Sequence, residues 1–505
     1  MIFQSISKVR DKSDFSFFEE LILVYCKIVR EICAKNKLEY SPKPIVITPE
    51  IISEMIDMGV IDNDGEIDLL KKTLKDLFAD FSYSVNIYLS NKQLFGGLLD
   101  KLSNKRRKEM QVADRKKDKP TFADFFAGAG GLSIGFSQNG FRVSFANDFE
   151  EVCVNTYKYN HPEIPSNKIL KADIRQIVNN IEDYIDEDID VVVGGPPCQG
   201  FSSANQQRII DDPRNELYKF YLKAIEKIVP KFVVMENVRG MLSVAHQVVE
   251  DYENIKATKN GVTYTYSIKY ELLNSANFGV AQSRERLIYI AIRNDVAESK
   301  GITPANIFEE IKQACVKNKI HNLSEALAFI KPLDAPRIKN TNEVDDEKTG
   351  KLIDNNQYTG HDNEYLSQIN QGRDIPLVYN HKARYINDIN YDIYRKLNPG
   401  DDASNEKIAD IMPYKHRLHC FKDKYYKLIP DRPSRTITAH LRMDCHSHIH
   451  PFQIRAITPR EAARCQSFPD DYLFLGAYLK TYMEIGNAVP VLMAKQIANT
   501  IKKYI

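Results

Sequence analysis

The sequence TFADFFAGAGGLSIGF, residues 121–136, decides the fold that we expect for this chain. Its first residues, Thr121–Phe126, form a short apolar run typical of a buried strand, and glycines separate this run from an amphipathic helix beginning at Leu132. Such a loop lets a ligand approach the backbone at the carboxyl end of a sheet. The spacing is G-x-G-G rather than G-x-G-x-x-G, so a tight packing turn is the alternative interpretation.

Further apolar runs follow and alternate with helix-like segments. We predict strands over residues 141–146, 190–193, 232–235 and 287–292, and a closing helix over 490–504. Alternation of this kind indicates an α/β fold with a parallel, doubly wound sheet and right-handed crossovers.

Acidic residues follow two of the expected strands. Asp148 is placed to bind the ribose hydroxyls of a nucleoside, because the carboxyl ends of parallel strands form the ligand edge of such a sheet. Asp173 would sit at the end of a third strand, where a carboxylate can accept a hydrogen bond from an adenine amino group. A helix cap is an equally good interpretation of Asp173.

The run GGPPCQGFS, residues 194–202, presents a candidate nucleophile, Cys198, in a loop that two prolines stiffen. A nucleophilic thiol needs a lowered pKa and a partner that handles protons. Glu236, at another strand end, can supply that partner, while Arg284 and Arg286 supply cations before a further strand. Each feature alone has a structural explanation, but they coincide at three successive strand ends.

Bulk composition restricts the class of protein. The chain has 505 residues, 43% of them hydrophobic and 27% charged, which suits a globular protein of two or three domains. We expect no membrane segment and no secretory signal, and therefore a cytoplasmic location. The 8 cysteines include no CxxC pair and should be reduced. A net charge of +1 does not mark a nucleic-acid binder, although a local basic face would suffice.

The first 118 residues read as a separate helical region. Helices are expected over 16–40, from Thr48-Pro49 onward and over 67–89. Residues 101–120 hold nine basic and three acidic side chains, which predicts a solvated linker or a basic arm that touches phosphates. We expect an accessory domain that adds contact to a nucleic acid; a regulatory module, a dimerisation element and a brace for the irregular part of the chain are the alternatives.

The remaining boundaries follow from the pattern of regularity. Residues 119–294 form the first part of a regular α/β domain, which holds the candidate nucleophile and is the expected catalytic domain. Residues 295–430 lose all sustained periodicity, and regularity returns over residues 431–505. The irregular part is expected to be a second domain or a large insertion.

These motifs resemble those of the DNA (cytosine-5)-methyltransferases of bacterial restriction–modification systems. The matching runs occur in the family's order: DFFAGAGGLSIGF (124–136), GGPPCQGFS (194–202), DDPRNELY (211–218), ENVRGML (236–242), NFGVAQSRERLIYIAIR (277–293), RPSRTITAHL (432–441), HIHP (448–451), ITPREAARCQSFPD (457–470) and IGNAVP (485–490). The family usually has proline where Ala281 stands. The resemblance covers residues 121–505 apart from a variable insertion, and implies a mixed, Rossmann-like methyltransferase sheet with residues 295–430 as target-recognition domain.

The resemblance implies S-adenosylmethionine as methyl donor and no metal. It places Phe126, Gly128 and Gly130 along the methionine and adenine moieties, and Asp148 on the ribose, with Glu150 or Glu151 as alternatives. Asp173, with Ile174, would hold the adenine. The pocket would be completed by Pro196, Asn487 and Val489.

The resemblance also implies roles in catalysis. Cys198 would add to carbon 6 of a flipped-out cytosine, Glu236 would hold ring nitrogen 3 and the amino group, and Arg286 the carbonyl oxygen. Arg284 would lie near the thiolate. We can name no side chain as the base that removes the carbon 5 proton; ordered water is an option. Expected DNA contacts are Ser202, Ser203, Gln206, Arg208, Arg435 and Thr436.

The expected partner is double-stranded DNA, bound by a monomer, and the accessory domain would add DNA contact. A cognate endonuclease is expected to be encoded nearby, with an orphan enzyme as the alternative. A tRNA cytosine-5 methyltransferase on the same fold is one alternative, although that group carries Cys-Phe-Thr where this chain has Cys420-Phe421-Lys422. A catalytically silent DNA-binding regulator is another. The Cys and His residues at 416, 419, 420, 445, 446, 448 and 450 invite a zinc interpretation, but their spacing is not finger-like.

Overall fold

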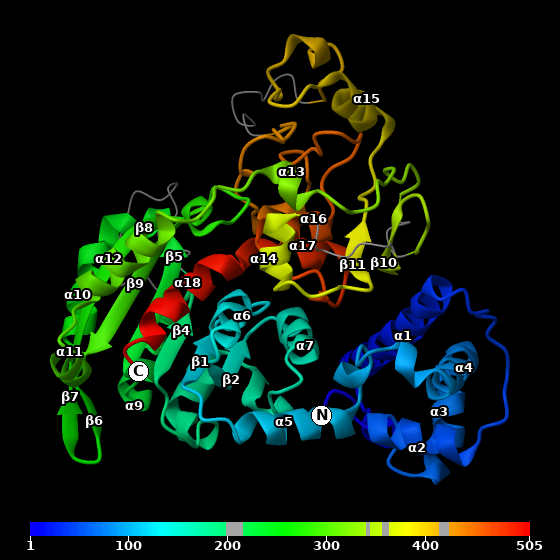
Figure 1. Cartoon of the computed structure of the whole chain (residues 1–505), viewed down its shortest axis with the longest axis horizontal. Coiled ribbons are helices and arrows are strands. Elements are labelled where there is room, and N and C mark those ends of the chain that lie inside the picture. Colours follow the sequence, from blue (N-terminus) through cyan, green and yellow to red (C-terminus); the bar gives the residue numbers. More distant parts are fainter. Residues whose placement is uncertain (198–215, 340–343, 356–362, 414–423) are drawn as a thin grey trace.

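The computed structural model describes residues 1–197, 216–339, 344–355, 363–413 and 424–505. An α/β catalytic domain, an irregular upper lobe and a helical N-terminal domain make up the molecule (Figure 1). The N-terminal domain lies beside the catalytic domain and below the upper lobe.

The catalytic domain is built on a seven-stranded sheet of order β3-β2-β1-β4-β5-β9-β8. Five strands are parallel neighbours: β1 (Thr121–Phe125), β2 (Arg142–Asp148), β3 (Ile169–Lys171), β4 (Val191–Gly194) and β5 (Phe232–Val238). Two are antiparallel, β9 (Glu285–Arg293) and β8 (Tyr266–Asn274). The alternation of strands and helices therefore predicted the parallel part correctly, and the mixed sheet implied by the family resemblance is confirmed.

Helices cover both faces of this sheet. One face packs against α6 (Gly131–Gln138), α12 (Pro304–Cys315) and α18 (Val491–Lys502) around Phe122, Val193 and Ile290. The opposite face packs against α8 (Ile174–Ile177), α9 (Glu216–Ile228) and α10 (Ala245–Glu253). Such two-sided burial explains why the central strands read as continuous apolar runs.

Glycines let the C-terminal segment reach the first helix of the catalytic domain. A Cβ atom on Gly131 would lie 2.3 Å from the carbonyl oxygen of Val489, and one on Gly135 would lie 2.5 Å from the Cβ of Ala494. Only glycine permits this approach, so α18, which corresponds to the closing helix expected over 490–504, returns to the start of the sheet.

The catalytic domain extends past the boundary expected at residue 294. Helices α11 (Asn294–Lys300) and α12 belong to the sheet's own core through Val296, Ile307, Phe308 and Ile311. Polar residues surround the few apolar positions of α12, so its sequence pattern is weak. The catalytic domain continues to about residue 315.

The upper lobe contains short elements, a large apolar cluster that also includes Ala129 and Ile134 of the catalytic domain, and a smaller cluster of its own. Its elements are α13 (Leu323–Ala326), β10 (Gly350–Asp354), α14 (Glu364–Asn370), β11 (Val378–Lys382) and α15 (Asp388–Lys396); β10 and β11 form an antiparallel pair. Helices α16 (Pro459–Cys465) and α17 (Tyr478–Asn487) form its base. Two elements of the catalytic domain lie outside its sheet and the helices described above. Strands β6 (Ala257–Lys259) and β7 (Val262–Tyr264) form another antiparallel pair, and helix α7 (Glu151–Asn160) follows β2.

The N-terminal domain is helical, as expected, with α1 (Lys12–Lys35), α2 (Pro49–Met58), α3 (Ile67–Leu74), α4 (Asp76–Ser90) and α5 (Asn104–Arg115). The single helix expected over 67–89 is broken at Lys75, whose φ of 52° is left-handed. The solvated linker expected over 101–120 was wrong for most of that stretch, because α5 packs on the catalytic domain. Arg107 is buried there and donates to the carbonyl of Lys158 at 2.7 Å.

Candidate active site

The glycine loop after β1 is tied to the end of β2 by a carboxylate. Asp148 accepts hydrogen bonds from the backbone N–H of Gly128, at 2.9 Å, and of Glu150, at 2.8 Å. Burial raises the pKa of the Asp148 carboxyl. Phe126, Gly128 and Gly130 all have positive φ, and a Cβ atom on Gly128 would meet nothing within 4 Å. The loop is therefore open where a ligand would approach its backbone.

A pocket of about 390 Å³ lies where β2 and β3 end, next to Asp148 in the chain. It is lined by Phe149, Glu150, Glu151, Lys171, Ala172, Asp173, Gln176 and Lys480. The Phe149 ring is 68% exposed, which is unusual for an aromatic residue and suits stacking against a flat ring. The sequence offered no signal for Phe149 beyond its position next to Asp148.

Asp173 lines the pocket but is engaged locally. Its carboxylate caps α8 by accepting from the backbone N–H of Arg175 at 2.9 Å, and it pairs with the Arg175 side chain at 2.6 Å. Hydrogen bonds from Arg175 lower the pKa of Asp173. The cap interpretation is therefore correct for this structure, and Ile174 is buried in the core beneath.

The C-terminal segment lies against the same loop. Val489 is buried and Asn487 is exposed at the end of α17. The Tyr472 hydroxyl donates to the carbonyl of Ala129 at 2.6 Å, which fixes the loop from this side.

The loop that carries Cys198 is held at its start by β5. Asn237 donates from Nδ2 to the carbonyl oxygen of buried Pro196 at 3.0 Å. Cys198 itself lies outside the described residues, as do the expected DNA contacts Ser202, Ser203, Gln206 and Arg208.

Glu236 and Arg286 lie together where β5 and β9 meet. Arg286 Nε is 2.8 Å from Glu236 Oε1, and both side chains are mostly buried. The other carboxylate oxygen, Oε2, faces Gly195, since a Cβ atom there would lie 3.1 Å from it. A carboxylate and a guanidinium thus stand beside the loop that leads to Cys198.

Arg284 is fully buried and joins three segments. It donates to the carbonyl oxygens of Ile437, at 2.6 Å, and Gly486, at 3.0 Å. Burial, followed by the positive charge of Arg286, lowers the pKa of Arg284 to about 9. These contacts hold the returning C-terminal segments on the sheet edge.

A second pocket, of about 480 Å³, opens beside Arg286. Its lining includes Arg239, Ser283 and Thr436. Thr436 donates to the carbonyl of Ser283 at 2.9 Å, and the Arg435 guanidinium lies 4.4 Å from the centroid of the Tyr426 ring. Of the residues expected to contact DNA, Thr436 therefore lines this pocket and Arg435 directly precedes it in the chain.

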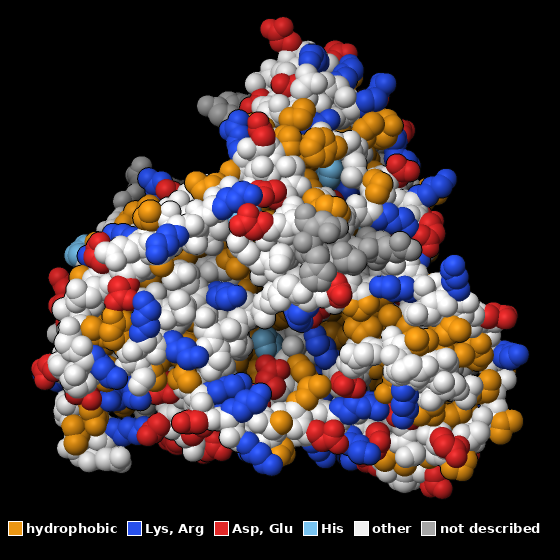
Figure 2. Space-filling model, in the orientation of Figure 1, with side chains coloured by type: hydrophobic (Ala, Val, Ile, Leu, Met, Phe, Trp, Pro, Cys, Tyr) orange, Lys and Arg blue, Asp and Glu red, His pale blue; other side chains and the backbone are white. Residues whose placement is uncertain are grey.

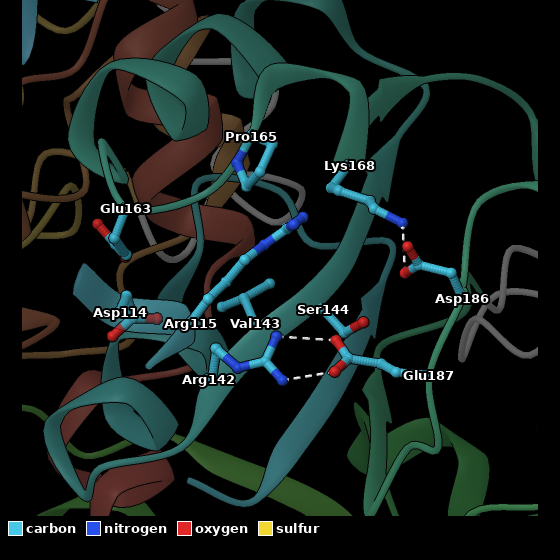
Figure 3. Close-up of a pocket in the computed structure, with 10 residues that line it drawn as sticks. All are labelled: Asp114, Arg115, Arg142, Val143, Ser144, Glu163, Pro165, Lys168, Asp186 and Glu187. Atoms are coloured by element: carbon cyan, nitrogen blue, oxygen red, sulfur yellow. Dashed lines mark hydrogen bonds and ion pairs between the residues drawn. The ribbon is translucent and has the colours of Figure 1, made fainter. Parts of the chain in front are cut away.

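A third pocket, of about 280 Å³, lies at the opposite edge of the sheet (Figure 3). Arg142 at the start of β2 pairs with Glu187, and Lys168 pairs with Asp186. Ligands of open α/β sheets bind outside the carboxyl ends of the strands, so this pocket is not the candidate site.

Among the described residues, no three His, Cys, Asp or Glu side chains gather as metal ligands. The His446 ring instead stacks on Tyr425, with ring centroids 4.6 Å apart. His416, His419 and Cys420 lie outside the described ranges. Within those ranges no helix combines the length and apolar character needed to span a membrane.

The sheet order, the glycine loop tied to an acidic strand end and the returning C-terminal helix define an α/β methyltransferase fold. A solved structure of a prophage-encoded E. coli protein assigned as a DNA modification methyltransferase is similar, with a TM-score of 0.53. It is 21% identical and covers 76% of this chain and 99% of its own.

Sequence comparison identifies the family. The model of the C-5 cytosine-specific DNA methylases matches residues 120–503. Type II methyltransferase M.AgeI of Thalassovita gelatinovora is 30% identical over 438 residues, covering 75% of this chain and 98% of that protein. Type II methyltransferase M1.HphI of Haemophilus parahaemolyticus is 29% identical, covering 76% and 87%.

The chain belongs to the C-5 cytosine-specific DNA methylase family. It is thus an enzyme that methylates carbon 5 of cytosine in DNA, which confirms the resemblance seen in the sequence. Methyl transfer implies a methyl donor.

Proposed function

We propose that this enzyme modifies cytosine within one specific duplex sequence, as the methyltransferase of a type II restriction–modification system. The observation that carries the proposal is the Glu236–Arg286 pair beside the Pro196 loop, on the sheet edge that also holds Asp148. The names of the similar proteins support the restriction–modification role. We further propose a cytoplasmic monomer with a cognate endonuclease.

S-adenosylmethionine fits the residues of the first pocket. Asp148 can accept from ribose hydroxyls, exposed Phe149 can stack on adenine, and the open glycine loop can run along the methionine part. Pro196, Asn487 and Val489 would close the pocket, and Asp173 would line it while capping α8. When bound, this donor supplies an electrophilic methyl group.

We assign covalent catalysis to the second pocket. The Cys198 thiolate adds to carbon 6 of the cytosine, so that a sulfur–carbon bond forms and electron density moves to carbon 5. Glu236 holds ring nitrogen 3 and the amino group and favours the protonated ring, while Arg286 holds the carbonyl oxygen. After methylation, loss of the carbon 5 proton expels the thiolate and restores the ring.

Arg284 has a different role in this proposal. Its donors go to the carbonyls of Ile437 and Gly486, so it assembles the edge of the site. An additional effect of Arg284 on the Cys198 thiolate stays a prediction.

The target cytosine must leave the helix, which costs a few kcal/mol of stacking and pairing. Loop residues Ser202, Ser203, Gln206 and Arg208 would close over the flipped base, with Arg435 and Thr436 contacting DNA from the rim. Residues of the upper lobe would read base edges in the major groove.

Three measurements test the proposal. Methyl incorporation should occur into duplex DNA and not into tRNA, and labelling of tRNA alone would overturn the assignment. A duplex with 5-fluorocytosine at the target should trap a covalent adduct; wild-type protein that binds DNA without forming it would be a silent regulator. Bisulfite sequencing of methylated DNA would then give the recognition sequence.

A further inference from the structure

The N-terminal domain shares its hydrophobic core with both other parts of the molecule. Its cluster of buried side chains includes Tyr159 from α7, Ile353 from β10, Tyr379 from β11, and Leu473 and Leu475 from the C-terminal segment. An independent domain joined only by a linker would have a hydrophobic core made of its own residues alone.

Contacts fix this domain to the catalytic domain. Arg107 donates to the carbonyl of Lys158, and Ser13 near the start of α1 donates to Glu151 at 2.5 Å. About two turns further along α1, Glu20 accepts from the backbone N–H of Gly476 at 2.5 Å. The amino-terminal half of α1 therefore sits on the catalytic domain and its C-terminal return.

The other half of α1 holds the β10–β11 pair. Lys27 pairs with Asp345 at 2.5 Å, and Glu31 pairs with Lys351 of β10 at 3.1 Å. The Glu31 side chain is only 6% exposed and Lys351 15%, so solvent screens this pair little. Asn355 also donates to the carbonyl of Glu31 at 3.3 Å.

The β10–β11 pair belongs to the upper lobe and is joined to the rest of that lobe. Arg384, two residues after β11, donates to the carbonyls of Leu441, at 2.8 Å, and Met443, at 2.7 Å. Those carbonyls belong to the segment that follows Arg435 and Thr436. A continuous series of packed and hydrogen-bonded groups thus runs from α1 to the rim of the site.

Three consecutive basic residues at the start of α5 bind groups of the protein itself. Lys105 pairs with Asp57, Arg106 pairs with Glu54, and Arg107 meets carbonyls. On the face shown in Figure 2, Lys and Arg side chains of this domain are interspersed with Asp and Glu. These three side chains are therefore not available as the DNA-contacting arm that the sequence suggested.

We infer that the N-terminal domain is an internal brace, in which α1 sets the position of the β10–β11 pair and the upper lobe relative to the catalytic domain. Glu31 and Lys27 are then positioning residues for target recognition. The inference rests on the proposed role of the upper lobe in reading DNA.

Single substitutions test the brace without removing the domain, since deletion would expose its shared core. Glu31→Gln and Lys27→Met remove one interdomain charge each. Arg30→Gln is the matched control, because Arg30 lies on the same helix but pairs within its own domain, with Asp80 at 3.3 Å. Glu31→Asp keeps the charge and should act as the conservative rescue.

We expect the KM for cognate DNA to rise roughly 2- to 30-fold in Glu31→Gln and Lys27→Met, with more methylation of near-cognate sites. The kcat at saturating DNA, the dissociation constant of S-adenosylmethionine and the salt slope of DNA binding should match wild type. Arg30→Gln should change none of these quantities, and Glu31→Asp should recover most of the KM.

Three outcomes would overturn the brace. One is an unchanged KM and unchanged site preference in both variants. Another is a smaller salt slope, which would mean that the domain contacts phosphates. A third is an equal effect of Arg30→Gln, which would mean general destabilisation. Failure of the proposed function looks different, because wild-type protein would then show no sequence-specific methylation at all.

Discussion

The parallel strands of the central sheet begin at one side of the sheet, called the amino edge, and finish at the other, called the carboxyl edge. The two sides carry acidic side chains in opposite settings. At the amino edge, Glu187 accepts from two nitrogens of Arg142 at 2.8 and 2.5 Å, and a hydrogen bond from Lys168 lowers the pKa of Asp186. Near the carboxyl edge, burial raises the pKa of Asp148, and that of Asp124 to about 7.

This difference indicates that acidic residues at the amino edge stabilise the fold, whereas those at the carboxyl edge can interact with a ligand. A bidentate guanidinium occupies both oxygens of Glu187, whereas the ion pair of Glu236 with Arg286 involves Oε1 and leaves Oε2 facing Gly195. Acids held by backbone N–H groups, as Asp148 is, keep lone pairs for a ligand. Substitutions of the residues that face the substrate at the carboxyl edge should therefore lower kcat, whereas substitutions at the amino edge should affect only stability.

The largest expected effect is on the rate constant of Glu236→Gln. The amide cannot favour the protonated ring as the carboxyl group does, so kcat should fall about 10²- to 10⁴-fold. Single-turnover methylation of a cognate duplex measures it. Glu187→Gln is the matched control at the other edge and should retain wild-type kcat; equal losses in both variants would contradict the comparison.

The second effect concerns Asp124, whose pKa of about 7 reflects its burial in β1, against an ordinary value of 3.8. The folded state holds this proton more tightly than the unfolded chain. Stability should therefore decrease as pH rises between about 4 and 7, by up to about 1.4 kcal/mol per pH unit, and level off above.

The variant Asp124→Asn removes this titration while keeping an acceptor for Ser133, which donates to Asp124 at 2.6 Å. Urea unfolding at several pH values should show that the free energy of unfolding of the variant rises relative to that of wild type as the pH increases from about 4 to 7. A difference between the two proteins that does not change with pH would show that Asp124 is ionised throughout.

Gly195→Ala should have an intermediate effect. Its new methyl group would lie 3.1 Å from Glu236 Oε2, so the carboxylate must shift by a few tenths of an ångström. Because small displacements of reacting groups are costly, we expect kcat to fall about tenfold with little change in stability. If kcat is unchanged, Oε2 is not the oxygen that faces the substrate.

Much of this site could be predicted from the sequence because its signals are local. An apolar run followed by Gly128 and Gly130 specifies strand, loop and helix within a few residues, and Asp148 and Glu236 directly end such runs. The motif around Cys198 and the order of the other motifs along the chain then predicted the reaction, through the resemblance to the DNA (cytosine-5)-methyltransferases.

Features that depend on distant partners could not be predicted. The charged sequence around Arg107 predicts a solvent-exposed side chain. Arg107 is buried because it donates to the carbonyls of Lys158 and His161, which are distant in the sequence. Strand β8 at the sheet edge is half-exposed and carries Lys269 and Glu271, so its apolar pattern is weak. The break at Lys75 has no glycine or proline to mark it.

The smallest expected effect is at the amino edge. Arg142→Gln leaves Glu187 without its bidentate partner, but Glu187 is about a third exposed and water can replace the guanidinium. We expect a loss of stability of at most about 1 kcal/mol, and kcat and the cofactor dissociation constant equal to those of wild type. Thermal unfolding and the methylation assay together check this result. A loss of cofactor affinity in Arg142→Gln would mean that β2 transmits changes between its ends, and that the two edges are coupled rather than separate.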